Sequence, residues 1–329
     1  MIDFLLPPEI PIFEPNRDPH DLKLRNIIHP WKGDKPGGRI DVGILGIPFD
    51  LGVKRSGGRT GAARAPDAIR RQIKKYGTAY NCVYGADLSS LNIIDFGNVD
   101  VIPAGVAATH SRARNVVQTL FGLCDTLIII GGGNDLSFAT ISGLRRAFGE
   151  PIGGMNVDAH LDVREVAKGN ITSGTPYRLL LERGVLLGEN LFEVGAQGHV
   201  NSKSHWGWAE EKGIHICPLQ MVKTIGVDML IKCFRRRMTC LIASFISVDI
   251  DAVAQAFAPG SSAPNPDGFS AAEILAISYL AGEIPNLRLF EIMEVNPEFD
   301  QDNRTSRLSV NIITDFLAGC AIRKQKTGH

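Results

Sequence analysis

Short apolar runs rich in β-branched residues alternate along the chain with segments whose apolar positions recur every three or four residues. The runs are almost continuously hydrophobic, which is typical of strands that a parallel sheet buries on both faces. The segments between them have the spacing of amphipathic helices. We expect strands near 41–47, 91–95, 126–131, 152–158, 191–196, 214–218, 240–251 and 287–296, and helices near 65–77, 108–124, 175–184, 270–282 and 307–322.

This alternation predicts a single α/β domain in which helices cover both faces of a mostly parallel sheet of eight strands. Residues 1–38 have a different character, because they are rich in Pro and charged residues and end in HPWKGDKPGG. We interpret them as an N-terminal arm that lies over the body of the protein. Residues 39–329 then form the domain, and no segment within them has the composition of a linker.

Charge and cysteine usage exclude several kinds of partner. Lys+Arg and Asp+Glu both number 35, so no bulk field attracts nucleic acid or an anionic membrane. The six cysteines include no C-x-x-C pair, which indicates a reducing compartment. The N-terminus lacks a basic start, and no apolar run reaches the roughly 20 residues of a membrane-spanning helix. We predict a cytoplasmic protein that acts on a small molecule, with no nucleic-acid or membrane partner.

Polar residues stand where three of the predicted strands end. In parallel sheets, ligands bind beyond the carboxyl ends of the strands, so these residues are candidates for chemistry. Residues two apart on an extended backbone point the same way and can converge on one point. The candidates are Asn134 and Asp135 in GGGND, Asp158, His160 and Asp162 in NVDAHLD, and Asp249 and Asp251 in SVDIDA.

Each motif taken alone has a simpler interpretation. GGGND is more often a tight turn or a weak nucleotide loop, and an Asp at a strand end commonly caps the next helix. His110 and the other isolated histidines are expected to be packing or surface residues. The carboxylates of DAHLD and DID, however, would repel one another unless cations lay between them. Carboxylates with one imidazole suit Mn²⁺, so the combined pattern predicts a metal site.

The combined motifs resemble the ureohydrolase family, which includes arginase, agmatinase and formimidoylglutamase. GIPFDLGVKRSGGRTGAARAPDAIR (46–70) resembles its opening segment, and IMEVNP (292–297) resembles a late strand. The resemblance implies a three-layer α/β/α fold of the arginase type, two Mn²⁺ ions per chain and a homo-oligomer, either a trimer or a hexamer. It implies that one ion is held by Asn134, Asp158, Asp162 and Asp249, and the other by Asp158, His160, Asp249 and Asp251.

The same resemblance implies a hydrolytic mechanism. A hydroxide that bridges the two ions attacks an amidine carbon, Asp162 orients that hydroxide, and Glu294 pairs with the amidinium or guanidinium group of the substrate. Most ureohydrolases have His where this chain has Asn134, and an amide oxygen is a weaker ligand than imidazole. The alternative is therefore a catalytically impaired homologue. Since all the charged ligand positions are intact, we favour a working enzyme.

The loop after the DAHLD motif indicates the substrate class. Arginases and agmatinases carry a His-Gly pair there, whereas VREVAKGNITSGTPYR (163–178) contains no His, and its SGTPYR resembles the SGTPFR of formimidoylglutamases. Arg164 and Arg178 suit a substrate with carboxylates, although each alone could equally form a surface salt bridge. With Ser173, Gly174 and Glu294 they are the candidate substrate contacts. The Pro-, Gly- and Ser-rich segment 252–270 is a candidate lid or specificity wall.

We therefore predict a Mn²⁺-dependent hydrolase of linear amidines that converts N-formimidoyl-L-glutamate to L-glutamate and formamide in histidine degradation. The alternative within the same family is a guanidine hydrolase acting on arginine, agmatine or a guanidino acid.

Overall fold

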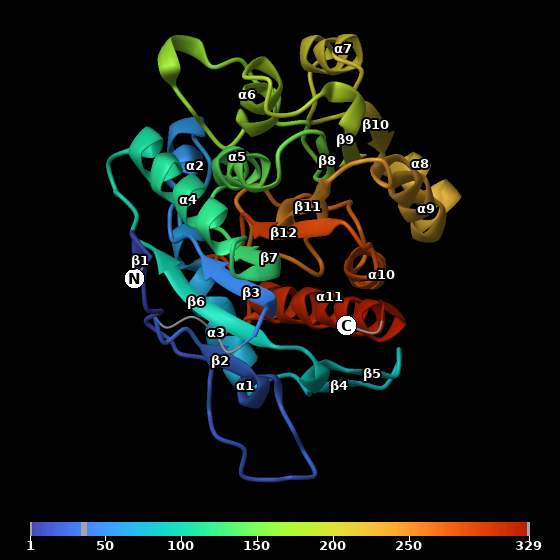
Figure 1. Cartoon of the computed structure of the whole chain (residues 1–329). Helices are drawn as coiled ribbons and strands as arrows, with labels where there is room; N and C mark the ends of the chain where they lie inside the picture. The colour runs from blue at the N-terminus through green and yellow to red at the C-terminus, as the bar shows by residue number, and fades with distance from the viewer. Residues whose placement is uncertain (1, 34–37, 328–329) are drawn as a thin grey trace.

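The computed structural model of the chain describes residues 2–33 and 38–327 (Figure 1). All eight strands expected from the apolar runs are present. They are β3 (Ile40–Gly46), β6 (Ile93–Val99), β7 (Cys124–Ile130), β8 (Ile152–Val157), β9 (Leu191–Ala196), β10 (His215–Pro218), β11 (Ala243–Asp249) and β12 (Leu287–Met293). Each runs parallel to its neighbours among the eight, so the predicted parallel sheet is confirmed.

The N-terminal residues add two more strands at one edge of this sheet. β1 (Leu5–Leu6) pairs antiparallel with β6, and β2 (Ile28–Pro30) pairs parallel with it. The sheet therefore has ten strands and is mixed, where eight were expected. A separate pair, β4 (Tyr80–Asn81) and β5 (Ala86–Asp87), is antiparallel. Residue 1 and residues 34–37 of the predicted arm lie outside the described residues.

Helices cover both faces of the sheet, so the predicted three-layer α/β/α arrangement is confirmed (Figure 1). On one face, apolar side chains of α4 (Val106–Leu120), α5 (Ser137–Phe148), α6 (Pro176–Glu182) and α7 (Lys203–Glu211) pack in one core. On the other face, the core includes α3 (Ala65–Lys75), α8 (Leu219–Ile225), α9 (Val227–Met238), α10 (Ala271–Gly282) and α11 (Arg304–Thr327). The short helices α1 (Leu24–Ile27) and α2 (Leu51–Ser56) complete the set.

The helical periodicity did not predict α5. Its first eight residues, 137–144, are all buried, since one side packs on the sheet and the other is covered by α4 and α6. An amphipathic pattern requires an exposed face, and this helix has none over its first two turns. Of the described helices, none is long and apolar enough to cross a membrane.

The strand order brings the polar strand ends together. β7, β12, β11 and β8 are consecutive neighbours in the sheet, although they lie far apart along the chain. Because they are parallel, their carboxyl ends share one edge. The close packing there explains the glycines of GGGND, since a Cβ on Gly132 would lie 1.9 Å from the backbone oxygen of Phe49.

Candidate active site

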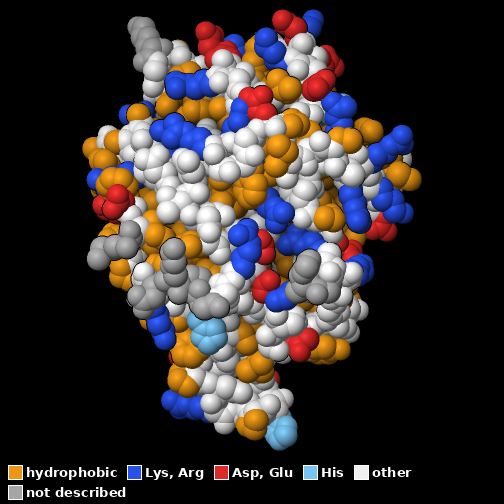
Figure 2. Space-filling view, viewed as in Figure 1, with side chains coloured by type: hydrophobic (Ala, Val, Ile, Leu, Met, Phe, Trp, Pro, Cys, Tyr) orange, Lys and Arg blue, Asp and Glu red, His pale blue; other side chains and the backbone are white. Residues whose placement is uncertain are grey.

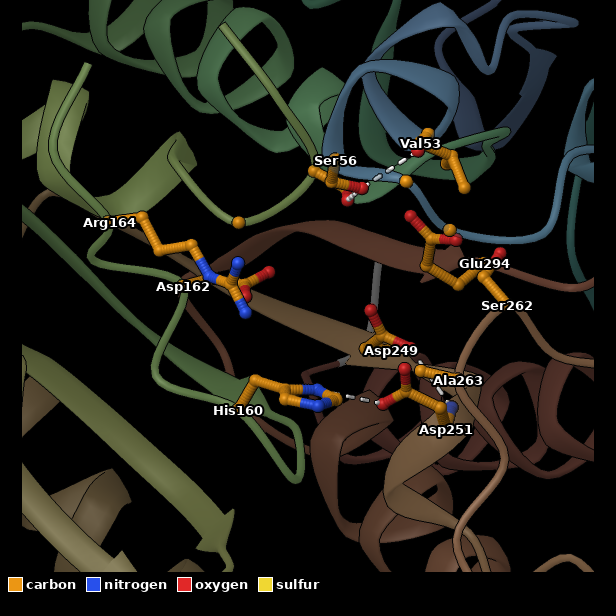
Figure 3. A pocket seen from close by; sticks show the side chains of 14 residues that line it. Val53, Ser56, His160, Asp162, Arg164, Asp249, Asp251, Ser262, Ala263 and Glu294 are labelled. Carbon is orange, nitrogen blue, oxygen red and sulfur yellow. Dashed lines mark hydrogen bonds and ion pairs between the residues drawn. The ribbon is translucent and has the colours of Figure 1, made fainter. Parts of the chain in front are cut away.

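A pocket opens at the shared carboxyl edge of these four strands, and the predicted acidic residues line it or lie beneath it (Figure 3). Asp158 directly follows β8, Asp249 is the last residue of β11, and Glu294 directly follows β12. Asn134 begins the turn that follows β7. The sheet topology therefore places at one site residues that lie up to 160 positions apart in the sequence, as with Asn134 and Glu294.

The acidic residues form two groups that share Asp158. One group is Asp158, His160 and Asp251, and the other is Asp158, Asp162 and Asp249. Within each group, one ligand atom of every residue lies within 4.8 Å of the others. Two overlapping sets of oxygen and nitrogen donors are the arrangement that a pair of divalent ions with a shared ligand requires.

His160 faces the carboxylates of Asp158 and Asp251, and Figure 3 shows its contact with Asp251. Its Nδ1 lies 3.3 Å from Asp158 Oδ1 and 3.5 Å from Asp251 Oδ1. Burial by itself would lower the pKa of His160, but the charges and hydrogen bonds of Asp251 and Asp158 raise that pKa to about 12. In the metal-free chain the protonated imidazole thus supplies positive charge beside these carboxylates, which is the electrostatic role that a bound metal ion would take over.

Among the described residues, no positive side chain other than His160 lies beside these carboxylates to balance their charge. Burial first, and then the neighbouring carboxylates, raise the pKa of Asp249 and of Asp162 well above the usual range. Among the side chains that the structure describes, no Lys or Arg nitrogen lies within 4 Å of these groups, and Asp251 Oδ1 has only a long contact of 3.5 Å with His160 Nδ1. Buried carboxylates whose negative charge is not balanced, and whose oxygens are free to act as ligands, suit hard or borderline divalent ions such as Mn²⁺.

Asn134 lies at the site but presents its amide nitrogen to it. Its Nδ2 donates to Asp162 Oδ2 at 2.7 Å and lies 3.4 Å from Asp158 Oδ2. Its Oδ1 accepts a hydrogen bond from Ser137 Oγ at 3.0 Å. The amide must therefore turn over before its oxygen can ligate a metal ion.

Glu294 and Asp162 have left-handed backbones, with φ of 63° and 47°. This region is uncommon for residues other than glycine, and such residues cluster at functional sites. Glu294 Oε1 accepts the backbone N–H of Asn134 at 2.6 Å, while its buried Oε2 has no hydrogen-bond partner. Burial raises the pKa of Glu294 well above its usual range. A buried, unpartnered oxygen in the pocket wall is suited to accept an N–H from a bound molecule.

The candidate substrate contacts fall into two sets. Arg164, Ser173 and Gly174 line the same pocket as the acidic residues. The guanidinium of Arg178 instead lies 4.1 Å from the ring centre of Trp208 and is paired with Glu182. Arg178 is therefore held on the outer side of α6, as the salt-bridge alternative expects, and is not brought to the pocket.

Two further loops complete the pocket. Ser262 and Ala263, from the segment predicted to be a lid or wall, line one side. The end of α2 lines another side, where Ser56 Oγ lies 3.0 Å from Ser173 Oγ and links two loops across the opening (Figure 3). The sequence analysis did not single out Ser56 as a pocket residue, because segment 46–70 entered it only as a resemblance to the family's opening segment.

The sequence analysis also missed a layer of buried polar residues beneath the metal ligands. Asn156, Glu193 and Glu291 are all fully buried on β8, β9 and β12. Their signal is present in the runs IGGMNV, LFEVGA and LRLFEIM, where each is a polar side chain in the fully buried part of a largely apolar strand. Burial of such groups is costly, so they seldom occur in a strand without a specific partner.

Comparisons with known proteins agree with this geometry. The family model described as "Arginase family" matches residues 40–319. A formimidoylglutamase of Halalkalibacterium halodurans is 30% identical over 309 residues, which cover 93% of this chain and 94% of that protein. The structure of Trypanosoma cruzi formiminoglutamase with Mn²⁺ aligns with a TM-score of 0.85 and 30% identity, covering 92% of this chain and 99% of that one. The formimidoylglutamase of Bacillus subtilis aligns with a TM-score of 0.86 at 27% identity, covering 94% and 95%.

Proposed function

The chain belongs to the arginase family, and we propose that it hydrolyses N-formimidoyl-L-glutamate to L-glutamate and formamide with two Mn²⁺ ions bound per chain. The observation that carries this proposal is the pair of ligand groups that share Asp158 at the floor of a pocket. Proteins that match the chain over most of its length include formimidoylglutamases, and the T. cruzi formiminoglutamase structure contains Mn²⁺.

The proposed ligands are the residues expected from the sequence. One ion would be held by Asn134, Asp158, Asp162 and Asp249, and the other by Asp158, His160, Asp249 and Asp251. Ions bound there would supply Lewis acidity and lower the pKa of a coordinated water toward neutrality. Bound metal would also balance the carboxylates, so that His160 no longer needs to serve as their cation.

The residues of the chain then bind and orient the substrate. Arg164 and Glu294 approach the pocket from opposite sides (Figure 3). The substrate has a cationic formimidoyl group and two carboxylates, so Glu294 Oε2 would accept an amidinium N–H while Arg164 pairs with a carboxylate. Ser173 and Gly174 shape the wall beside Arg164, since a Cβ on Gly174 would lie 2.8 Å from Arg164 Cδ.

Asp162 is the proposed proton carrier. In the metal-free chain its Oδ2 accepts a hydrogen bond from Asn134 Nδ2 at 2.7 Å, a contact that is lost once the amide turns over to ligate an ion. As a ligand beside the coordinated water, the Asp162 carboxylate would take up the proton that the attacking water releases. It would deliver that proton to the departing amine of glutamate.

A product assay tests the proposed reaction. The Mn²⁺-loaded protein is incubated separately with N-formimidoyl-L-glutamate, arginine, agmatine and a guanidino acid, and the release of formamide and of urea is measured. We expect formamide from the first substrate and no urea from the others. Exclusive urea release would refute the proposal in favour of a guanidine hydrolase, and Mn²⁺ binding without turnover of any substrate would support an impaired homologue.

We further infer a homo-oligomer, a trimer or a hexamer, and a cytoplasmic location. The family resemblance supports the first inference. The second is supported by the six scattered cysteines, which include no C-x-x-C pair and indicate a reducing compartment. Light scattering coupled to size-exclusion chromatography measures the oligomer, and a monomeric mass would overturn that inference.

A further inference from the structure

Two buried polar residues lie directly behind Asp158 and have no role in the proposed reaction. Asn156 precedes Asp158 by two positions on β8, and Glu193 is its register partner on the neighbouring strand β9. Both side chains are fully buried. A polar pair in the middle of two apolar strands costs stability unless its hydrogen bonds serve a purpose.

The Asn156 amide nitrogen joins Glu193 to Asp158. Its Nδ2 donates to Glu193 Oε2 at 2.9 Å and to Asp158 Oδ2 at 3.3 Å. Both amide hydrogens are therefore used, whereas Asn156 Oδ1 and Glu193 Oε1 have no hydrogen-bond partner. The two hydrogen bonds of Asn156 Nδ2 thus form a chain of contacts that runs from Glu193 through Asn156 to Asp158.

Glu193 and Asp158 together favour the orientation in which the Asn156 amide nitrogen faces both carboxyl groups. An asparagine side chain can present either oxygen or nitrogen, and a carboxyl oxygen of Glu193 accepts a hydrogen bond only from the nitrogen end. The opposite orientation would place the amide oxygen of Asn156 against an oxygen of Asp158, which is repulsive.

The orientation of Asp158 depends in turn on this contact. Its Oδ1 accepts the backbone N–H of His160 at 2.7 Å, so Oδ1 is held from the loop side. Its Oδ2 is held from below by Asn156 at 3.3 Å. With both oxygens restrained by the chain, the plane of the carboxylate is fixed before any ion arrives.

We propose that Asn156 and Glu193 are positioning residues for the metal centre, which orient the shared ligand Asp158 through the hydrogen-bonded line Glu193–Asn156–Asp158. This inference rests on the proposed function, since it requires Asp158 to serve both ions. Partners behind metal ligands fix ligand geometry, and their loss typically costs 10–100-fold in metal affinity. Burial raises the pKa of Glu193 well above its usual range, so a neutral side chain can replace it.

The first test is Mn²⁺ binding by the metal-free Asn156→Leu variant, measured by isothermal titration calorimetry. We expect the dissociation constant to rise about 10–100-fold while the folded structure is retained. The matched control is Asn286→Leu. Asn286 Nδ2 also donates two hydrogen bonds, to Met238 O at 2.8 Å and Leu241 O at 3.0 Å, but it lies at the opposite end of the sheet. We expect native Mn²⁺ affinity in this control.

The second test compares two substitutions of Glu193. Glu193→Gln keeps a neutral oxygen that accepts the Asn156 hydrogen bond, so Mn²⁺ affinity should stay within about 2-fold of native. Glu193→Leu removes the acceptor, so affinity should fall as it does in Asn156→Leu. A role limited to stabilising the core predicts lower thermal stability in both leucine variants but unchanged Mn²⁺ affinity of the folded chains.

The outcomes separate the two proposals. Native affinity in Asn156→Leu, or equal affinities in Glu193→Gln and Glu193→Leu, would overturn the positioning role and leave the proposed function standing. If Asn156→Leu does not fold, the Glu193 pair decides the question alone. Failure of the native protein to bind Mn²⁺ would instead refute the proposed function.

Discussion

Replacing Glu291 with glutamine should stabilise the metal-free protein at alkaline pH. Glu291 is fully buried on β12, in register with Ser247 on one neighbouring strand and Ile129 on the other. Burial raises its pKa to about 7, even though the hydroxyls of Thr140, Ser137 and Ser247 lie close enough to lower it in part. Neither carboxyl oxygen makes a well-formed hydrogen bond, so these hydroxyls stabilise the ionised form of Glu291 only in part.

The raised pKa of Glu291 determines the sign and the size of the change in the free energy of unfolding with pH. The ordinary pKa of a glutamate is 4.5, so between pH 4.5 and about pH 7 the folded chain keeps a proton on Glu291 that the unfolded chain has lost. The free energy of unfolding therefore falls as pH rises through this window and levels off above it. At about 1.4 kcal/mol per pKa unit, the full loss is about 3 kcal/mol. Glu291→Gln has no such group, and its amide can use the nearby hydroxyls as acceptors.

Urea denaturation of the metal-free native and variant proteins measures this effect. We expect Glu291→Gln to be more stable by about 3 kcal/mol at about pH 8.5, and by about 1 kcal/mol at about pH 5.5. Glu211→Gln, at an exposed position, controls for the loss of one carboxylate. A stability difference that does not change with pH, or that favours the native protein at pH 8.5, would refute the reasoning.

Three further predictions concern the metal and substrate sites. Asp249→Asn should lower the Mn²⁺ content below two ions per chain, as measured by elemental analysis, and lower the activity in the formamide assay at least 100-fold. A variant that still binds two ions per chain would contradict the role of Asp249 as a ligand. Arg164→Met should raise the KM for N-formimidoyl-L-glutamate about 10–100-fold, because a charged hydrogen bond contributes about 1.5–3 kcal/mol. Arg178→Met is its matched control and should change KM less than about 2-fold, and equal effects of the two variants would show that Arg164 has no special contact with substrate. Burial and like charges raise the pKa of Asp162 and of Asp249 in the folded chain. The folded chain therefore keeps protons that the unfolded chain loses near pH 4, and the free energy of unfolding falls as the pH rises above that value. The Tm of chelator-treated protein should therefore fall between about pH 5.5 and pH 8, whereas the Mn²⁺-loaded protein should show a smaller fall, and parallel Tm profiles would contradict this.

The sequence predicted the parallel strands because a strand buried on both faces is apolar at nearly every position. β7 and β11, for example, are almost entirely buried along their length. It did not predict β1 and β2, which contain two and three residues. Strands this short have no recognisable period, and they form because the exposed edge of β6 offers hydrogen-bond partners.

The acidic site was predictable for a topological reason. Each of its motifs ends a parallel strand, so all must lie at one edge of the sheet. The role of Arg178 was not predictable, since only the packed structure shows that Trp208 and Glu182 hold its guanidinium. The prediction that His110 is a packing residue is confirmed, because it is buried and its Nε2 lies 2.7 Å from Asp135 Oδ2.

The left-handed backbones of Asp162 and Glu294 limit which substitutions can raise the thermal stability of the protein without loss of its activity. Such conformations cost on the order of 1–3 kcal/mol each in a residue with a side chain, and glycine would largely remove that cost. A screen that ranks variants by heat resistance alone would therefore favour glycine at both positions and enrich inactive proteins. Thermostabilised versions should be sought by substitutions elsewhere, with these two codons held constant.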